Sequence, residues 1–452
     1  MLDYFYHRNL KPDLERWVEK GWVSSDSAAN ILREIEGGDG RSGLPLALAG
    51  IGVVCVALAL AAFIAANWDG IPRNAKLIGI VLLVAGSHGV AALCASKGKK
   101  GLADLATAFA SLTFICGMAL VGQIFHLSAN LSGGAFLVTI GALAAAWLTG
   151  SRASLIISAI AAIIWQWERP EFGAGLLQAN IIGFVFFAAT ALHAARYSNM
   201  LTRWLTVALL MVSVGRLIVD YAPKEGVHRD LEEFMVITGF ACLAAIMVQV
   251  PAIIDMAIKW ASSYPKRHLG HWMLMSSFQD AGILILCALT PFLLIVLADG
   301  NEMPFIQNFS TIPQFVLLAL ALASSVIGAV LSFKTGKALT LFGVIFLALL
   351  AAFMPLVIDS MIVLSALALA ASIAIVVLGT LYRRHLWSLG GYAALSVISL
   401  WLLYETIGSL LGQALFFLIA GLLLLVLAFA AMKLLKHFSP AKTPASGKEA
   451  AQ

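Results

Sequence analysis

Long apolar runs with few or no charges recur along almost the whole chain. Each run is roughly 18–25 residues long, the length that an α-helix needs to cross about 30 Å of hydrocarbon at 1.5 Å per residue. A transmembrane β-barrel would instead show segments of about ten residues with alternating polarity. The pattern therefore predicts an all-α fold, a polytopic transmembrane helix bundle.

Runs of this length predict about fourteen spans. They lie near residues 44–66, 77–95, 104–125, 131–149, 153–167, 174–193, 200–219, 233–257, 273–298, 313–333, 338–358, 361–382, 387–404 and 408–432. Composition agrees with this prediction. The chain is 61% hydrophobic and 12% charged, whereas soluble domains are about 25% charged.

Positive residues are distributed unequally between alternate loops. With the N-terminus on the cytoplasmic side, the inner segments hold 23 of the 29 Lys and Arg residues, the outer segments hold 5, and Arg216 lies within a span. Positive side chains are retained on the cytoplasmic side of membranes, so both termini are predicted to be cytoplasmic. The net charge of +5 therefore reflects topology and does not indicate nucleic-acid binding.

The largest predicted soluble piece is residues 1–43. Proline, glycine and apolar spacing predict two short helices in it, Pro12–Lys20 and Ser25–Glu36, each with one apolar face. A helix-turn-helix DNA reader is the alternative, but six Lys and Arg against eight Asp and Glu oppose phosphate binding. We expect a helical hairpin that packs on the membrane domain or docks a protein partner, and a disordered cytoplasmic tail at residues 436–452.

Three motifs together resemble a known family. They are LERWVEKGWVSSDSAANIL at Leu14–Leu32, AANWDGIP at Ala65–Pro72 and GMALVGQIFHLS at Gly117–Ser128. Roughly residues 10–150 of the chain resemble the bacterial membrane proteins grouped as domain of unknown function 2157. The resemblance implies a bacterial inner (cytoplasmic) membrane location, and it brings no reaction, substrate or catalytic residue. We accordingly divide the chain into the hairpin, a family-like four-helix membrane segment at 44–150, further transmembrane helices at 151–435, and the tail.

Polar groups at membrane depth are costly and are candidates for functional sites. Asp69, Gln123 and His126 would form a patch on the outer face if the first loop folds back, although helix-end anchoring also explains them. Arg216 and Asp220 are four residues apart, so a local ion pair explains them without a site.

Deeper candidates are His88, Gln249 and Asp280. His88 is near the middle of its predicted span, where it acts either as a structural residue hydrogen-bonded to another helix or as a proton relay. Asp280 either lies inside its span, where it should pair with Gln249 or another polar group, or marks the cytoplasmic border.

Two functional hypotheses of different class remain. The first is a transporter or flippase of a small or lipid-like solute, favoured by many helices, short loops and polar residues inside spans. The second is a non-transporting membrane sensor or assembly scaffold that docks a partner through the hairpin. We expect no enzyme activity, cofactor or metal site, because neither a nucleophile–base pair nor a phosphate-binding loop stands out in the sequence.

Overall fold

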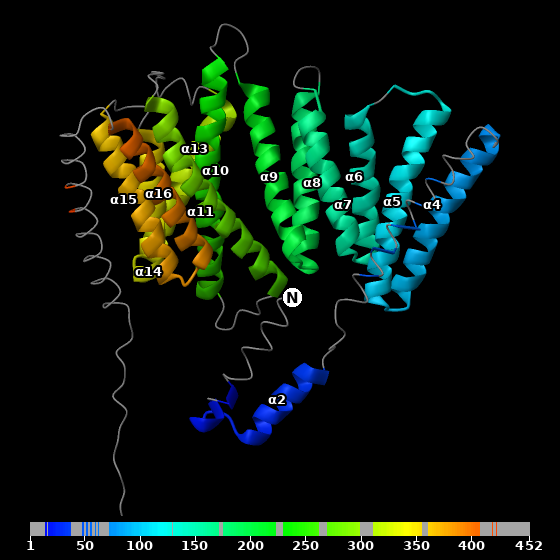
Figure 1. Cartoon of the computed structure of the whole chain (residues 1–452), viewed down its shortest axis with the longest axis horizontal. Helices are drawn as coiled ribbons and strands as arrows, with labels where there is room; N and C mark the ends of the chain where they lie inside the picture. The colour runs from blue at the N-terminus through cyan, green and yellow to red at the C-terminus, as the bar shows by residue number, and fades with distance from the viewer. Residues whose placement is uncertain are drawn as a thin grey trace, which may run out of the picture. The chain divides into compact units, whose positions relative to one another are not determined.

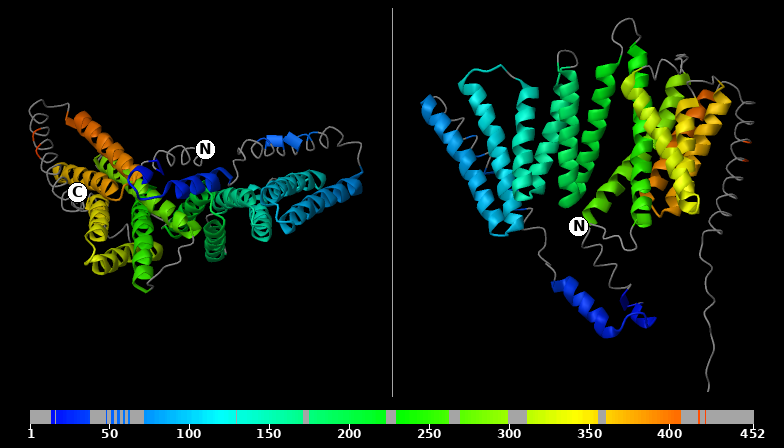
Figure 2. Two further views of the ribbon diagram at one scale, coloured as in Figure 1. Left: turned by 90° about the horizontal axis from the view of Figure 1, so that it is seen from below. Right: turned by 180° about the vertical axis from the view of Figure 1, so that it is seen from behind.

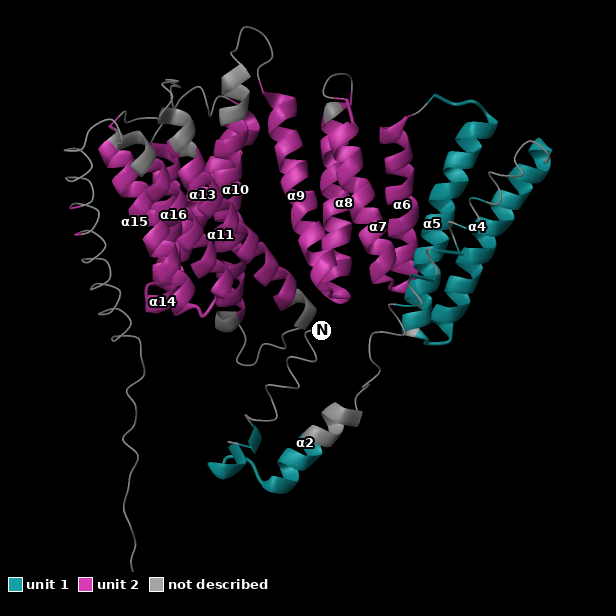
Figure 3. Ribbon diagram, viewed as in Figure 1, with its two compact units in different colours: residues 1–128 teal, residues 129–452 magenta. Residues whose placement is uncertain are grey.

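The structure is a computed structural model of the chain, all-helical in the part that it describes (Figure 1). It describes residues 14–15, 17–37, 72–128, 130–170, 175–222, 229–261, 269–298, 311–354 and 360–406, together with residues 48, 51, 52, 55, 56, 59, 62, 418 and 422. The chain divides into two compact units, residues 1–128 and 129–452 (Figure 3).

The first unit begins with a short helical part that contains α2, Ser25–Gly37. Its first turn is capped by Ser24, whose Oγ accepts a hydrogen bond from the backbone N–H of Ser27 at 3.2 Å. Before it, residues 14–15 and 17–19 are helical, and Gly21 follows with a positive φ of 68°. The two helical stretches lie where the sequence predicts them.

The membrane part of the first unit contains α4, Arg73–Ser96, and α5, Lys100–Ile124, which pack against each other. Gly117 of α5 permits their close approach, because a Cβ atom there would lie 2.9 Å from Cγ2 of Ile80. Small residues at such contacts are typical of helix packing in membranes.

The second unit consists of the remaining described helices (Figures 1 and 2). They are α6 Leu131–Thr149, α7 Arg152–Glu168, α8 Leu176–Arg196, α9 Met200–Tyr221, α10 Arg229–Ala261, α11 Leu269–Ala298, α13 Ile312–Ser332, α14 Gly336–Phe353, α15 Met361–Leu381 and α16 His385–Thr406. α9 packs against α7 and α8 on one side and against α10, α11 and α13 on the other.

Local signals set several helix ends. Asn130 caps α6 by accepting a hydrogen bond from the Gly133 N–H at 2.8 Å. Gly150 ends α6 in the left-handed conformation, and Ser151 caps α7 through the Ser154 N–H at 3.1 Å. These capping residues explain how α6 can turn directly into α7.

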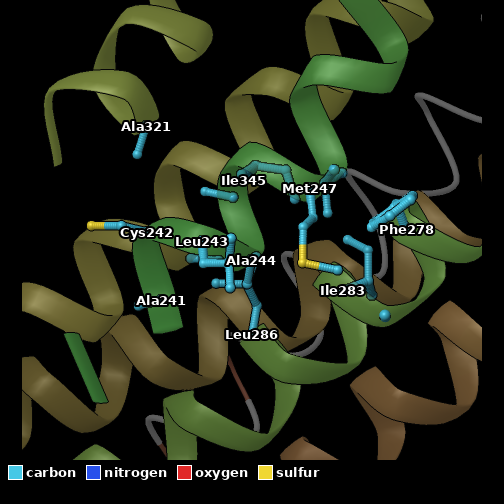
Figure 4. Packing of buried hydrophobic residues seen from close by; sticks show 14 of the residues in the cluster. Ala241, Cys242, Leu243, Ala244, Met247, Phe278, Ile283, Leu286, Ala321 and Ile345 are labelled. Atoms are coloured by element: carbon cyan, nitrogen blue, oxygen red, sulfur yellow. The ribbon is translucent and has the colours of Figure 1, made fainter. Parts of the chain in front are cut away.

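Small residues let α10 and α11 approach closely in the centre of the second unit (Figure 4). Ala241, Ala244 and Ala245 of α10 are fully buried, and a Cβ atom on Gly282 of α11 would lie 2.6 Å from the carbonyl oxygen of Ala244. Larger side chains such as Ile283 and Leu286 fill the space beside this contact (Figure 4).

Among the described residues, 11 helices are long and apolar enough to cross a membrane. α7, which has 17 residues, measures about 26 Å and packs beside α6 and α9. Those 11 and α7 coincide with twelve of the fourteen expected spans. The expected spans 44–66 and 408–432 and the tail fall outside the described residues, apart from single positions. The structure confirms a polytopic helical bundle.

The expected domain boundaries, with a family-like segment at 44–150, stay predictions, and the compact units divide before α6. Packing accounts for this division, because Ser154 and Ser158 of α7 donate hydrogen bonds to the carbonyl oxygens of Ala142 and Thr139 of α6, at 2.8 and 3.0 Å. α6 therefore belongs with α7.

Candidate functional site

A buried ionic cluster joins α7, α8 and α9, and we call it the Arg169 cluster. Its members are polar or charged side chains from the end of α7, the first turns of α8 and the second half of α9. They are Gln166, Arg169, Asn180, Ser213, Arg216 and Asp220. The side chains of Arg169 and Asp220 are 2% and 0% exposed, so the central ion pair is withdrawn from solvent.

Arg169 is the centre of this cluster. Its Nη2 donates to Asp220 Oδ2 at 2.7 Å and to Asn180 Oδ1 at 2.9 Å, and its Nε donates to Gln166 Oε1 at 2.6 Å. Asn180 Nδ2 also donates to Asp220 Oδ2, at 2.9 Å. One arginine thereby connects three helices.

Arg216 extends the cluster along α9. Its Nη2 donates to the backbone carbonyl of Arg169 at 2.7 Å and lies 3.8 Å from Asp220 Oδ1. The ion pair between Arg216 and Asp220 that the sequence suggests is present, but Arg169 is closer to the Asp220 carboxylate than Arg216 is. An isolated surface pair is therefore not an adequate description of Asp220.

Gly183 of α8 makes room for Gln166, because a Cβ atom at Gly183 would overlap Gln166 Nε2. That nitrogen donates to Ser213 Oγ at 3.0 Å, while the amide oxygen accepts from Arg169. Glycine at this position therefore allows both ends of the Gln166 amide to be bonded.

Sequence reasoning missed Arg169, Asn180 and Gln166 as members of one site. The signal in the sequence was that the three residues lie at a similar depth in the membrane, near the end of one span and the start of the next. In an antiparallel bundle the end of one helix lies beside the start of the next, so polar residues at successive helix ends converge.

A second cluster joins α9, α11 and α16, and we call it the Asp280 cluster. Trp387 Nε1 donates to Asp280 Oδ1 at 2.8 Å, and Arg384 Nη1 lies 3.7 Å from the same oxygen. Arg384 Nη1 also donates to Ser276 Oγ at 2.7 Å. Arg203, near the start of α9, donates to the carbonyl of Met273 of α11 at 2.9 Å, about one turn before Ser276. The members are Arg203, Ser276, Asp280, Arg384 and Trp387.

The turn between α15 and α16 brings Arg384 to Asp280. Arg383 has a positive φ of 54°, which is uncommon for a residue with a side chain, and the Arg384 N–H donates to the Gly379 carbonyl at 2.8 Å. This tight connection sets Arg384 immediately before the first turn of α16.

Gln249, Ser324 and Ser325 form an uncharged group between α10 and α13, which we call the Gln249 cluster. Ser324 Oγ donates to Gln249 Oε1 at 2.5 Å, and Gln249 Nε2 donates to Ser325 Oγ at 2.8 Å. Pro251 follows within α10 and cannot donate a backbone hydrogen bond. The structure does not bring Gln249 and Asp280 together, since Gln249 bonds to α13 and Asp280 to α16.

The remaining candidates lie in the first unit. His88 is half-buried, and its Nδ1 lies 2.9 Å from the carbonyl oxygen of Val84 in its own helix, whereas the sequence suggested a partner on another helix. Gln123 and His126 are exposed at the end of α5, where His126 has a positive φ of 49°. Asp69 lies outside the described residues, so the outer patch stays a prediction.

The family comparison bears on the first unit and the start of the second. Residues 15–155 match the family model described as predicted membrane protein (DUF2157). The DUF2157 match confirms the resemblance carried by the three motifs. It includes His88, Gln123 and His126 but ends before the Arg169, Asp280 and Gln249 clusters. No curated protein and no solved structure matches the chain.

Proposed function

We propose that this multi-pass membrane protein is a transporter of a small or lipid-like solute, set in the cytoplasmic membrane with both termini inside. In this proposal the Arg169 cluster closes the outer end of the solute path and the Asp280 cluster closes the inner end. Asp280 acts as a gate residue paired with arginine.

The observation that carries the proposal is that α9 enters both clusters. Arg203 near its start bonds to α11 within the Asp280 cluster, and Asp220 at its end contributes to the Arg169 cluster. The two residues are 17 positions apart, about 26 Å along a helix, which is close to the thickness of the hydrocarbon core. A tilt of α9 relative to its neighbours would therefore weaken contacts at both membrane faces.

Energetics favour a role beyond structure. Replacing a buried ion pair by well-packed apolar residues is often neutral or stabilising by about 1–4 kcal/mol, because two charges lose their hydration. Ionisable residues inside membrane proteins accordingly mark functional sites by default. Arginine–carboxylate pairs that separate and re-form are suited to gates.

The Gln249 cluster is a candidate for the part of the path that contacts the solute in this proposal. It is uncharged, buried and followed by a proline within α10, and interrupted or proline-containing helices commonly line solute sites in transporters. Gln249 and its two serines offer donors and acceptors without the cost of a charge at that depth.

Cysteine labelling at Ser325 tests the proposal without a known solute. In a variant whose five native cysteines are replaced by alanine, Ser325→Cys is exposed to a small, charged, membrane-impermeant thiol reagent from each side in turn, in right-side-out and inverted vesicles. Val326→Cys is the matched control, because Val326 is the next residue of α13 and is 62% exposed on the outside of the helix.

Transport predicts that Ser325→Cys reacts from both sides, because the path opens alternately. Val326→Cys should be protected from the charged reagent by lipid. Reaction of Ser325→Cys from one side only, or from neither side, would overturn the proposal.

The second candidate, a sensor or assembly scaffold, is favoured by Trp22 in the soluble part of the first unit. This indole is 69% exposed, and exposed aromatic residues are enriched where proteins dock. A photo-reactive amino acid at position 22 should then cross-link one protein in cells, while Ser325→Cys stays unlabelled. A cross-linked partner together with two-sided labelling would instead mean that a transporter carries a docking site.

A further inference from the structure

We propose that the Arg169 cluster binds a carboxylate group, so that the carried solute is a carboxylate-bearing anion; this inference rests on the proposed function. Asp220 occupies the carboxylate position in the closed state, and the solute takes that position when the cluster opens.

Asp220 shows which chemical group the donors of the cluster recognise. Arg169 Nη2 and Asn180 Nδ2 both donate to Asp220 Oδ2, at 2.7 and 2.9 Å. A planar guanidinium group beside an amide N–H matches a carboxylate oxygen in charge and in direction. These donors come from the α7 end and from α8, whereas Asp220 belongs to α9, so a movement of α9 would separate Asp220 from the donors.

Arg169 also has a donor that Asp220 does not use. Its Nη1 atom is buried and has no hydrogen-bond partner among the residues that the structure describes. A guanidinium group cannot lose its proton in proteins, and a buried donor without an acceptor costs free energy. A carboxylate with one oxygen at Nη1 and the other at Nη2 would satisfy both atoms in the bidentate geometry that arginine favours.

The hydrogen bonds of Asp220 allow a solute carboxylate to replace its side chain beside Arg169. Only its Oδ2 atom accepts hydrogen bonds in the described part of the chain, while Oδ1 lies 3.8 Å from Arg216 Nη2. Arg216 is four residues earlier on the same helix and moves with α9. When Asp220 leaves Arg169, its negative charge therefore keeps a cationic neighbour.

Acetate is the probe for this site, and the full-length protein purified in detergent micelles is the sample. The Asp220→Ala variant removes the resident carboxylate and leaves space beside Arg169. Its Tm should be several degrees higher in sodium acetate than in sodium chloride of equal concentration, because a ligand that binds the folded state stabilises it. Adding Arg169→Gln to the same variant should abolish the difference.

Two results would overturn the inference: no acetate effect in Asp220→Ala, or an effect that persists without Arg169. Should Asp220→Ala fail to fold, the wild-type protein decides. Acetate should raise its Tm by a smaller amount, since acetate must displace Asp220, while the neutral isostere acetamide should not. Equal Tm values in acetate, acetamide and chloride would then refute the carboxylate site.

The carboxylate can come from a soluble solute or from a lipid headgroup. Nanodiscs of phosphatidylcholine alone are compared with nanodiscs that also contain phosphatidylserine, which carries a carboxylate, or phosphatidylglycerol, which is anionic without one. Stabilisation by phosphatidylserine alone assigns a lipid headgroup, and stabilisation by acetate alone assigns a soluble solute. If neither stabilises the protein through Arg169, the inference is wrong.

Failure of this inference can be told apart from failure of the transport proposal. Two-sided labelling of Ser325→Cys without an acetate effect would remove the carboxylate assignment and leave transport. An acetate effect without two-sided labelling would leave a static carboxylate site and remove the solute assignment together with transport.

Discussion

Trp387 shows how a single residue can make an acid tolerable inside a helix bundle. Its indole ring is 1% exposed, and its Nε1 donates to Asp280 Oδ1 at 2.8 Å. Arg384, at 3.7 Å from the same oxygen, balances the charge without making this hydrogen bond. The Trp387 indole therefore orients the Asp280 carboxylate through a hydrogen bond, and Arg384 compensates its negative charge.

Trp387→Phe should lower the free energy of unfolding by about 1.5–3 kcal/mol, the value of a hydrogen bond to a charged group. Phenylalanine keeps an apolar ring but loses the N–H donor. Unfolding of the purified protein in detergent, followed by temperature or denaturant, measures the change. Trp167→Phe is the control, because Trp167 is 71% exposed; equal losses in the two variants would mean that the Asp280 contact contributes nothing particular.

The sequence singles out Asp280 and Gln249 but does not predict their partners. Helical periodicity assigns a residue to a face and a depth, while Trp387 is more than a hundred residues away from Asp280 and belongs to one of several helices that could cover that face. Asp220 illustrates the same limit. Its local neighbour Arg216 follows from spacing, whereas Arg169 becomes its partner only through the packing of α7 against α9.

At the scale of helices, the sequence is more informative. The expected spans 200–219 and 361–382 correspond to α9, Met200–Tyr221, and α15, Met361–Leu381. Membrane helices can be predicted from sequence because each must be apolar over a fixed length. Which helices touch is decided by small residues and polar side chains at particular contacts, and the apolar pattern contains little information about these.

Gly183 provides a test of such a contact. Gly183→Ala should lower the free energy of unfolding by about 1–3 kcal/mol, because the added methyl group overlaps Gln166 and forces α7 and α8 apart or breaks the amide hydrogen bonds. Gly343→Ala on α14 is the matched control, since a Cβ atom there meets nothing within 4 Å. The same unfolding measurement applies, and a loss no larger than in the control would argue against tight packing at Gly183.

Combining Gly183→Ala with Gln166→Ala sharpens this test. Removal of the Gln166 side chain gives the new methyl group room, so the double variant should lose less stability than the sum of the two single losses. Simple additivity would show that the two residues do not compete for the same space.

For the whole molecule, the unequal distribution of Lys and Arg predicts which ends of the helices face the cytoplasm. After alanine replaces the native cysteines, Leu127→Cys should react with an impermeant thiol reagent in intact cells. Lys99→Cys and Lys334→Cys should react only after the cells are opened. All three residues are exposed at helix ends. Labelling of Lys334→Cys in sealed cells would invert the orientation and exchange the inner and outer roles of the two clusters.

The stretch that matches the family model ends inside a pair of packed helices, which would matter for a shorter protein that contained only that stretch. That stretch ends at residue 155, within the first turn of α7, although Ser158 supplies a hydrogen bond to the Thr139 carbonyl of α6. The sequence unit shared between proteins and the unit that packs as one body are therefore different lengths of chain. A polypeptide that stopped at the end of the match would carry α6 without the hydrogen bond from Ser158, and lipid or another helix would cover the face of α6 that α7 covers in this chain.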